Sequence, residues 1–202
     1  MTSELPRRAL PALLLLGACS TVKTEGGVEA RFTLRADVPD GVEAAALGLR
    51  RGEILPCSVA SAGGLIGAAH ADHSHTSPTT FDLHGEVDLL AASPQALATL
   101  APPAGGWCAL RLTVEPDGDG PSALIRGAPA GGAVVEAQSN STAFIDLSVD
   151  PAVDLDADHP SHTFSLAVDL APWVAALSTP DEPEGARSEA LFAAARASVS
   201  LD

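Results

Sequence analysis

The sequence predicts an all-β fold: an antiparallel β-sandwich of about seven to eight strands with a short C-terminal helix. Short segments that alternate apolar and polar residues recur along the chain, and clusters of Pro, Gly and Asp separate them. Only the last stretch, residues 186–200, has the apolar spacing of a helix. Alternation with a period of two is typical of strands that bury one face, so most of the chain is expected to form strands.

The first strand is expected within residues 28–38, where Ala30, Phe32 and Leu34 alternate with charged and polar residues. Residues 42–55 are expected to form a second strand, or a strand and a turn. Residues 80–90 alternate in the same way and predict a further strand.

The second half of the chain continues the pattern. Residues 107–115 predict a strand that ends in a turn at 117–120, where Asp and Gly alternate. The remaining strands are expected within 122–129, 132–138, 141–150 and 161–174. The final helix has Ser188 as a candidate N-cap and Leu191, Ala195 and Val199 on one stripe.

The amino terminus has the features of an export signal. Arg7 and Arg8 precede an apolar run, 9–16, that is too short to span a bilayer. The next residues, ending in Leu16-Gly17-Ala18-Cys19, resemble the lipobox of bacterial lipoproteins. The alternative is an ordinary cleaved signal that ends near a cysteine.

The lipoprotein resemblance implies a location and an anchor. In that family the peptide is cut before the cysteine, so Cys19 would be the acylated first residue and would hold the protein on the membrane through lipid. Ser20 follows, rather than Asp, which implies the outer membrane, with the protein facing the periplasm or the cell surface. The expected organisation is a signal peptide over 1–18, a lipidated tether over 19–27, the β-sandwich over 28–177, and an acidic linker with the C-terminal helix over 178–202.

The two other cysteines, Cys57 and Cys108, predict one disulfide, because exported proteins fold in an oxidising compartment. Two free buried thiols, or two soft metal ligands, are the alternatives.

The net charge of −15 argues against a nucleic-acid partner, because an anionic surface repels phosphates. The chain also has no tyrosine and few other aromatic residues on which bases could stack. A protein partner in the cell envelope is compatible with this surface.

Half of the six histidines fall in one short loop, where His70, His73 and His75 share the segment with Asp72. Imidazole is the commonest protein ligand of copper and zinc, and a carboxylate can complete a four-coordinate shell. A second pair, His159 and His162, follows later in the chain, beside Asp156 and Asp158. These residues predict a copper or zinc site if the two segments meet. The same composition is also compatible with weak adventitious binding, or with a polar loop that has no role in metal binding.

Residues 28–177 also resemble, through strand order and the segments 87–90, 102–115 and 164–174, the methanobactin-associated periplasmic copper-binding β-sandwich family. In that family histidines hold the metal, in some members with a modified tryptophan. Neither Trp107 nor Trp173 lies within two residues of a histidine in this sequence, so none of the family's ligands is carried over.

No motif indicates an enzyme: the sequence has no Gly-x-Ser-x-Gly, no His-Glu-x-x-His and no phosphate-binding glycine loop. The prediction is therefore a non-catalytic, lipid-anchored metal-binding protein. The alternative is a structural or protein-interaction lipoprotein of the envelope.

Overall fold

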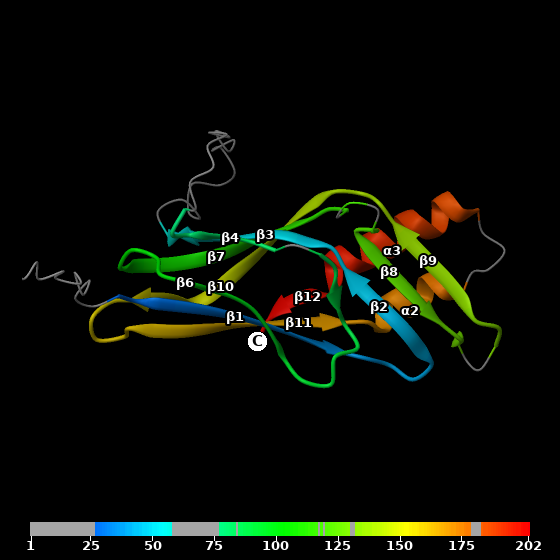
Figure 1. The fold of residues 1–202 in the computed structure, drawn as a ribbon, viewed down its shortest axis with the longest axis horizontal. Coiled ribbons are helices and arrows are strands. Elements are labelled where there is room, and N and C mark those ends of the chain that lie inside the picture. The colour runs from blue at the N-terminus through cyan, green and yellow to red at the C-terminus, as the bar shows by residue number, and fades with distance from the viewer. Residues whose placement is uncertain are drawn as a thin grey trace, which may run out of the picture.

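Strands form most of the part of the chain that the structure describes. The computed structural model describes residues 27–57, 77–83, 85–116, 118, 120–129, 132–178 and 183–202. Within them, twelve strands form three four-stranded sheets, and two helices follow near the C-terminus (Figure 1). The expected all-β sandwich class is confirmed, although the strands outnumber the seven or eight that the sequence predicts.

Sheets I and II form the two layers of the sandwich. Sheet I has the order β12–β11–β1–β6, with β1 Glu29–Asp37, β6 Gln95–Leu100, β11 Ser161–Asp169 and β12 Val199–Leu201. Sheet II has the order β10–β7–β3–β4, with β3 Leu49–Pro56, β4 Thr80–Asp82, β7 Gly105–Val114 and β10 Ala143–Leu155.

Among the described strands, pairing is antiparallel with one exception. Strands β1 and β11 run parallel, with Phe32 opposite Phe164 in the register. Phe32, Phe164 and Phe81 of sheet II meet in the core between the sheets: the Phe32 ring centroid lies 4.6 Å from that of Phe81 and 5.1 Å from that of Phe164.

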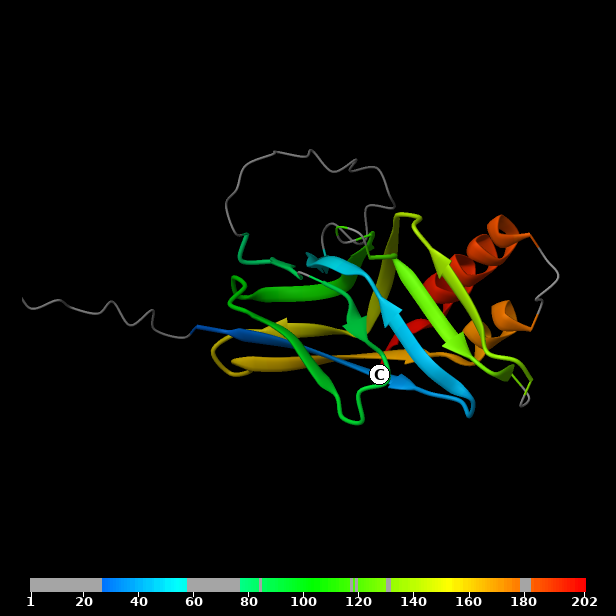
Figure 2. The same cartoon turned by 45° about the vertical axis from the view of Figure 1, so that its right-hand side comes forward.

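Sheet III continues from the sandwich and carries the helices on one face. Its order is β5–β2–β8–β9, with β2 Val42–Leu47, β5 Val87–Asp88, β8 Ala123–Gly127 and β9 Val135–Ser139. Helices α2 (Ala171–Leu177) and α3 (Glu184–Ser198) pack against β8 and β9, and Figure 2 shows them behind this sheet.

Gly48 is the point at which the chain passes from sheet III to sheet II. Its N–H donates to the Ser122 carbonyl at 2.9 Å, and its own carbonyl accepts from Glu115 N–H at 3.0 Å. A Cβ at this position would lie 2.6 Å from the Glu115 carbonyl oxygen. Only glycine allows so close an approach, so residues 42–55 form two strands in different sheets rather than one.

Several sequence-based boundaries were wrong. Residues 80–90 split into β4 and β5, which join different sheets, and Gly85 between them has a φ of 106°. Residues 171–174, predicted as the end of a strand, belong to α2, which has a proline in its first turn. Helix α3 begins before Ser188, so this residue lies inside the helix and Pro183 takes the N-cap position. Strands β6 and β12 were not predicted.

Candidate functional site

The histidine-rich segment lies outside the described residues, and so does the lipidation site. His70, Asp72, His73 and His75 belong to 58–76, and Cys19 belongs to 1–26. The structure does place the two residues that bound the first segment, Cys57 and Ser77, and the second predicted segment, which contains His159 and His162. Where these points lie decides whether the two segments share one end of the sandwich.

They do share it. Trp107, near the start of β7, pairs with Pro56 of β3 on one side and with Val153 of β10 on the other. The ends of β3 and β10 therefore flank the start of the same strand (Figure 1). Ser77 precedes β4, which runs antiparallel to β3, so it also lies at this end. We call this region, formed by the ends of β3 and β10 and the starts of β4, β7 and β11, the histidine end.

The predicted disulfide is confirmed at the histidine end. Cys57 and Cys108 are bonded, with a Cα–Cα distance of 4.7 Å, and connect the end of β3 to β7. A Cβ added to the neighbouring Gly106 would lie 3.3 Å from the Cys57 sulfur and 3.0 Å from an Asp154 carboxylate oxygen. The disulfide and Asp154 therefore lie side by side, next to the start of the histidine-rich segment.

The turn between β10 and β11 is built around Asp156. One oxygen of its carboxylate accepts the backbone N–H of Asp158 at 2.8 Å and that of His159 at 2.7 Å. The hydrogen bond from His159 N–H is the main cause that lowers the pKa of Asp156. The His159 Nδ1 lies 3.3 Å from the same oxygen, and its side chain is largely exposed. Asp156 therefore orders the turn and holds His159 beside a carboxylate.

His162 lies two residues before the buried Phe164 and on the same side of β11. Its ring centroid is 4.8 Å from that of Phe164, in an edge-on arrangement. Desolvation lowers the pKa of His162, which favours the neutral imidazole, the form that can bind a metal. The two described histidines thus come from one segment at the histidine end, His159 from its turn and His162 from its strand.

The described residues alone do not make a metal site. Among them, no group of three or more His, Cys, Asp or Glu side chains is placed to hold an ion. A complete site would need ligands from the histidine-rich segment in addition to His159 or His162.

Trp107 carries an unusual polar group at the same end. Its side chain is 3% exposed, and its indole N–H is buried without a hydrogen-bond acceptor in the described part of the chain. The other tryptophan, Trp173, donates its buried N–H to the Ser198 hydroxyl at 2.8 Å. Most buried N–H groups in native proteins have such an acceptor. Among the described side chains, Trp107 and Arg187, whose Nε is also buried without a partner, depart from this rule.

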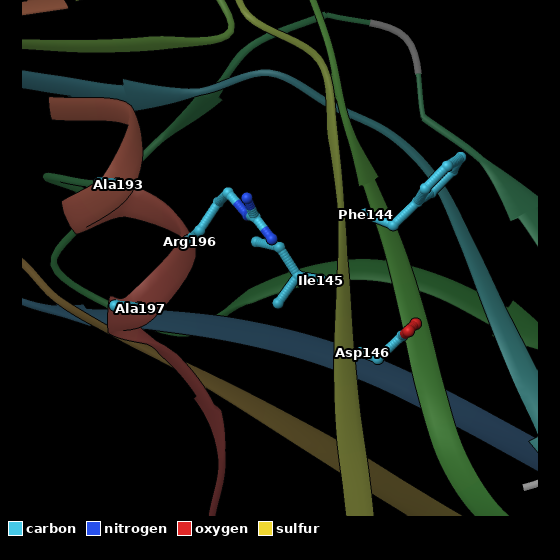
Figure 3. Close-up of a pocket in the computed structure, with 6 residues that line it drawn as sticks. All are labelled: Phe144, Ile145, Asp146, Ala193, Arg196 and Ala197. Atoms are coloured by element: carbon cyan, nitrogen blue, oxygen red, sulfur yellow. The ribbon is translucent and has the colours of Figure 1, made fainter. Parts of the chain in front are cut away.

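Sequence reasoning missed a second feature, a groove of about 400 Å³ between β10 and the last turns of α3. Figure 3 shows Ile145 and Arg196 pointing into the space between the two elements, with Phe144 and Asp146 on the other side of β10. The alternation in 141–150 predicts a strand. It does not predict which element lies beside the open edge of that strand, because this depends on where α3 packs.

No described helix is both long and apolar enough to cross a membrane. Comparison with known proteins found no matching family model, no similar curated protein and no similar solved structure.

Proposed function

We propose that this chain is a lipid-anchored protein of the bacterial cell envelope that binds copper or zinc at the histidine end of its sandwich. His70, His73 and His75 are the proposed primary ligands, and Asp72, His159 and His162 are candidates to complete the shell. One observation supports the proposal above the others: both histidine-bearing segments attach to the same end of the sandwich.

Chain length is compatible with this proposal. An extended chain spans at most ~3.6 Å per residue, so the two residue steps from Ser77 back to His75 can span about 7 Å, and the seven steps back to His70 about 25 Å. Strands β4 and β10 are the outer strands of a four-stranded sheet, roughly 14 Å apart. The first segment can therefore reach the turn that carries His159.

The ligand chemistry favours copper or zinc over calcium. Neutral imidazole is a good donor to late first-row metals, whereas calcium prefers sites made of oxygen ligands. Since a histidine must lose its proton to bind, the affinity is expected to fall as the pH drops below about 6.5.

The test is a competition titration of the purified chain with Cu(I), Cu(II) and Zn(II) against chelators of known affinity. Submicromolar stoichiometric binding is expected, with loss of the site in the His70/His73/His75→Ala variant. A His159/His162→Ala variant should bind more weakly if the second segment contributes ligands. The matched control is His84→Ala, because His84 belongs to neither segment. Micromolar or weaker binding, or equal binding by the triple variant, would refute the metal site.

The lipid anchor has a separate test. The Cys19→Ser variant should leave the membrane fraction, because two or more acyl chains hold a protein stably at a membrane. Fractionation of the outer and inner membranes would then show whether the wild-type chain is in the outer membrane, as Ser20 implies.

A different observation favours a second candidate function, that of a non-catalytic interaction lipoprotein. Strand β10 has an open edge beside a groove, and open edges and exposed apolar surface are features of protein-binding sites.

A further inference from the structure

Strand β10 is an edge strand whose backbone is available for pairing. Among the described strands it is the outermost of sheet II, hydrogen-bonds only to β7 and lies near β12. From Ala143 to Ser148 its register with β7 is regular, and it shifts between Ser148 and Val153. In an antiparallel pair every second residue directs its N–H and C=O away from the partner strand. Over 143–148 no described residue pairs with these outward groups.

Helix α3 faces this edge with small residues. Ala193 and Ala197 line the groove together with Ile145, which is 6% exposed. The groove volume, about 400 Å³, lies within the usual range of ligand-binding pockets. The small helix side chains leave room beside the outer edge of β10, so an added extended chain could lie there.

Arg196 gives the groove a positive charge that nothing in the described chain neutralises. The net charge is −15, and most arginines in the described residues pair with a carboxylate. These paired arginines are Arg31, Arg35, Arg50, Arg51, Arg111 and Arg126. Arg196 forms no ion pair with a described residue although it is exposed and lines the groove. An unpaired cation in so anionic a protein is suited to a carboxylate from outside.

The rim beside the groove is held in place. Phe144, 53% exposed, has the guanidinium of Arg111 5.6 Å from its ring centroid. Arg111 also makes two hydrogen bonds to the Asp146 carboxylate, at 2.7 and 3.1 Å. An exposed aromatic ring held by its neighbours is typical of the residues that dominate protein–protein binding, because little side-chain entropy is lost on contact.

We propose that β10 and α3 form a docking groove for an extended acidic segment of a partner protein. The segment would add a strand to β10 along Ala143–Ser148, about 20 Å of chain, and place a carboxylate against Arg196. This inference rests on the second candidate function and is independent of metal binding at the histidine end.

The test uses the full chain in detergent micelles and a phage library that displays random 12-residue peptides. Enriched peptides should alternate apolar and polar residues and carry Asp or Glu at one position. Arg196→Gln should weaken binding by about three- to tenfold, and Arg196→Glu by more, because it places two negative charges together. Ala197→Trp, a change at an exposed helix position, should block the groove.

Arg187→Gln is a control for the loss of one arginine charge from the same helix. Arg187 does not line the groove and forms no ion pair with a described residue, but unlike the exposed Arg196 it is half-buried, and its Nε has no hydrogen-bond acceptor among the described residues. The change in net charge equals that of Arg196→Gln, and circular dichroism of both variants checks that each is folded. The peptide affinity of Arg187→Gln should equal that of the wild type.

Backbone pairing has its own readout. Peptides N-methylated at one set of alternate residues should lose binding, whereas those methylated at the other set should keep it. Tolerance of both sets, or no enriched peptide, would overturn the inference. Peptides that bind Arg196→Glu as well as wild type would overturn the groove but leave an interaction function elsewhere on the surface. Self-association of the chain that Arg196→Glu abolishes would identify a second copy as the occupant and would also overturn the proposal.

Discussion

Substitution of Gly52 by alanine tests the packing that holds β4, the strand that follows the histidine-rich segment. Gly52 lies opposite Phe81 in the β3–β4 pair, and the Phe81 ring covers it. A Cβ at Gly52 would lie 2.1 Å from Cζ and 2.3 Å from Cε1 of that ring. Both distances are far below van der Waals contact, so the ring would have to move.

The ring has little room to do so. Phe81 is 6% exposed and packs on Phe32, which stacks on Phe164. Forcing a methyl group into a well-packed core costs about 1–3 kcal/mol. Gly52 does not have a positive φ, so alanine also gains about 0.4–1 kcal/mol by restricting the unfolded chain. The expected net loss is about 1–2 kcal/mol of unfolding free energy.

Urea denaturation followed by circular dichroism measures this loss. The control is Gly185→Ala in the first turn of α3, where an added Cβ meets no atom within 4 Å, so this variant should be no less stable than the wild type. The double variant Gly52→Ala/Phe81→Leu should lose about 1 kcal/mol less than the sum of the single variants, because leucine leaves space for the methyl group. A Gly52→Ala variant as stable as wild type, or additive losses, would refute this account of the core.

Three further results are expected. Trp173→Phe should destabilise by about 1–2 kcal/mol more than Trp107→Phe, because only Trp173 loses a buried hydrogen bond; equal losses in urea melts would show that the Trp107 N–H has an acceptor. Replacing Cys57 and Cys108 by serine should lower the unfolding free energy by about 4 kcal/mol, the value that the chain-entropy model gives for a bridge between cysteines 51 residues apart. A decrease below about 1 kcal/mol in urea melts would contradict that model for this chain. In the metal-free chain, burial lowers the pKa of His162 below 6.5, so the unfolded state binds the His162 proton more tightly than the folded state does. The unfolding free energy should therefore fall as the pH drops from above 6.5 through the folded-state pKa. The His162→Gln variant should lose less stability than the wild type between about pH 7.5 and 5.5.

Much of the fold follows from local patterns. The alternation in 28–38 predicted the buried face of β1, and Ala30, Phe32 and Leu34 are all buried. The apolar stripe of the C-terminal helix was correct for Leu191 and Ala195, which are buried in α3, whereas Val199 is buried in β12. These predictions succeed because burial of one face imposes a period on the residues themselves.

The wrong boundaries have a common cause. Residues 80–90 alternate as one strand would, yet they form two short strands in separate sheets. Val199 fits a helical stripe but begins β12, which pairs with β11. Periodicity shows which side chains are buried, whereas only the neighbouring strands decide where a segment ends and which sheet it joins.

Residue types and their spacing were enough to predict the all-β class, the disulfide and the residues of a metal site, because none of these predictions requires knowing how the strands pack. The folded chain was needed to show that the end of β3 and the end of β10, next to the turn that holds His159, flank the start of β7. It alone placed Arg196 beside the open edge of β10. These positions arise from strand pairing and helix packing between residues far apart in the chain, and such contacts leave no periodic pattern in the sequence.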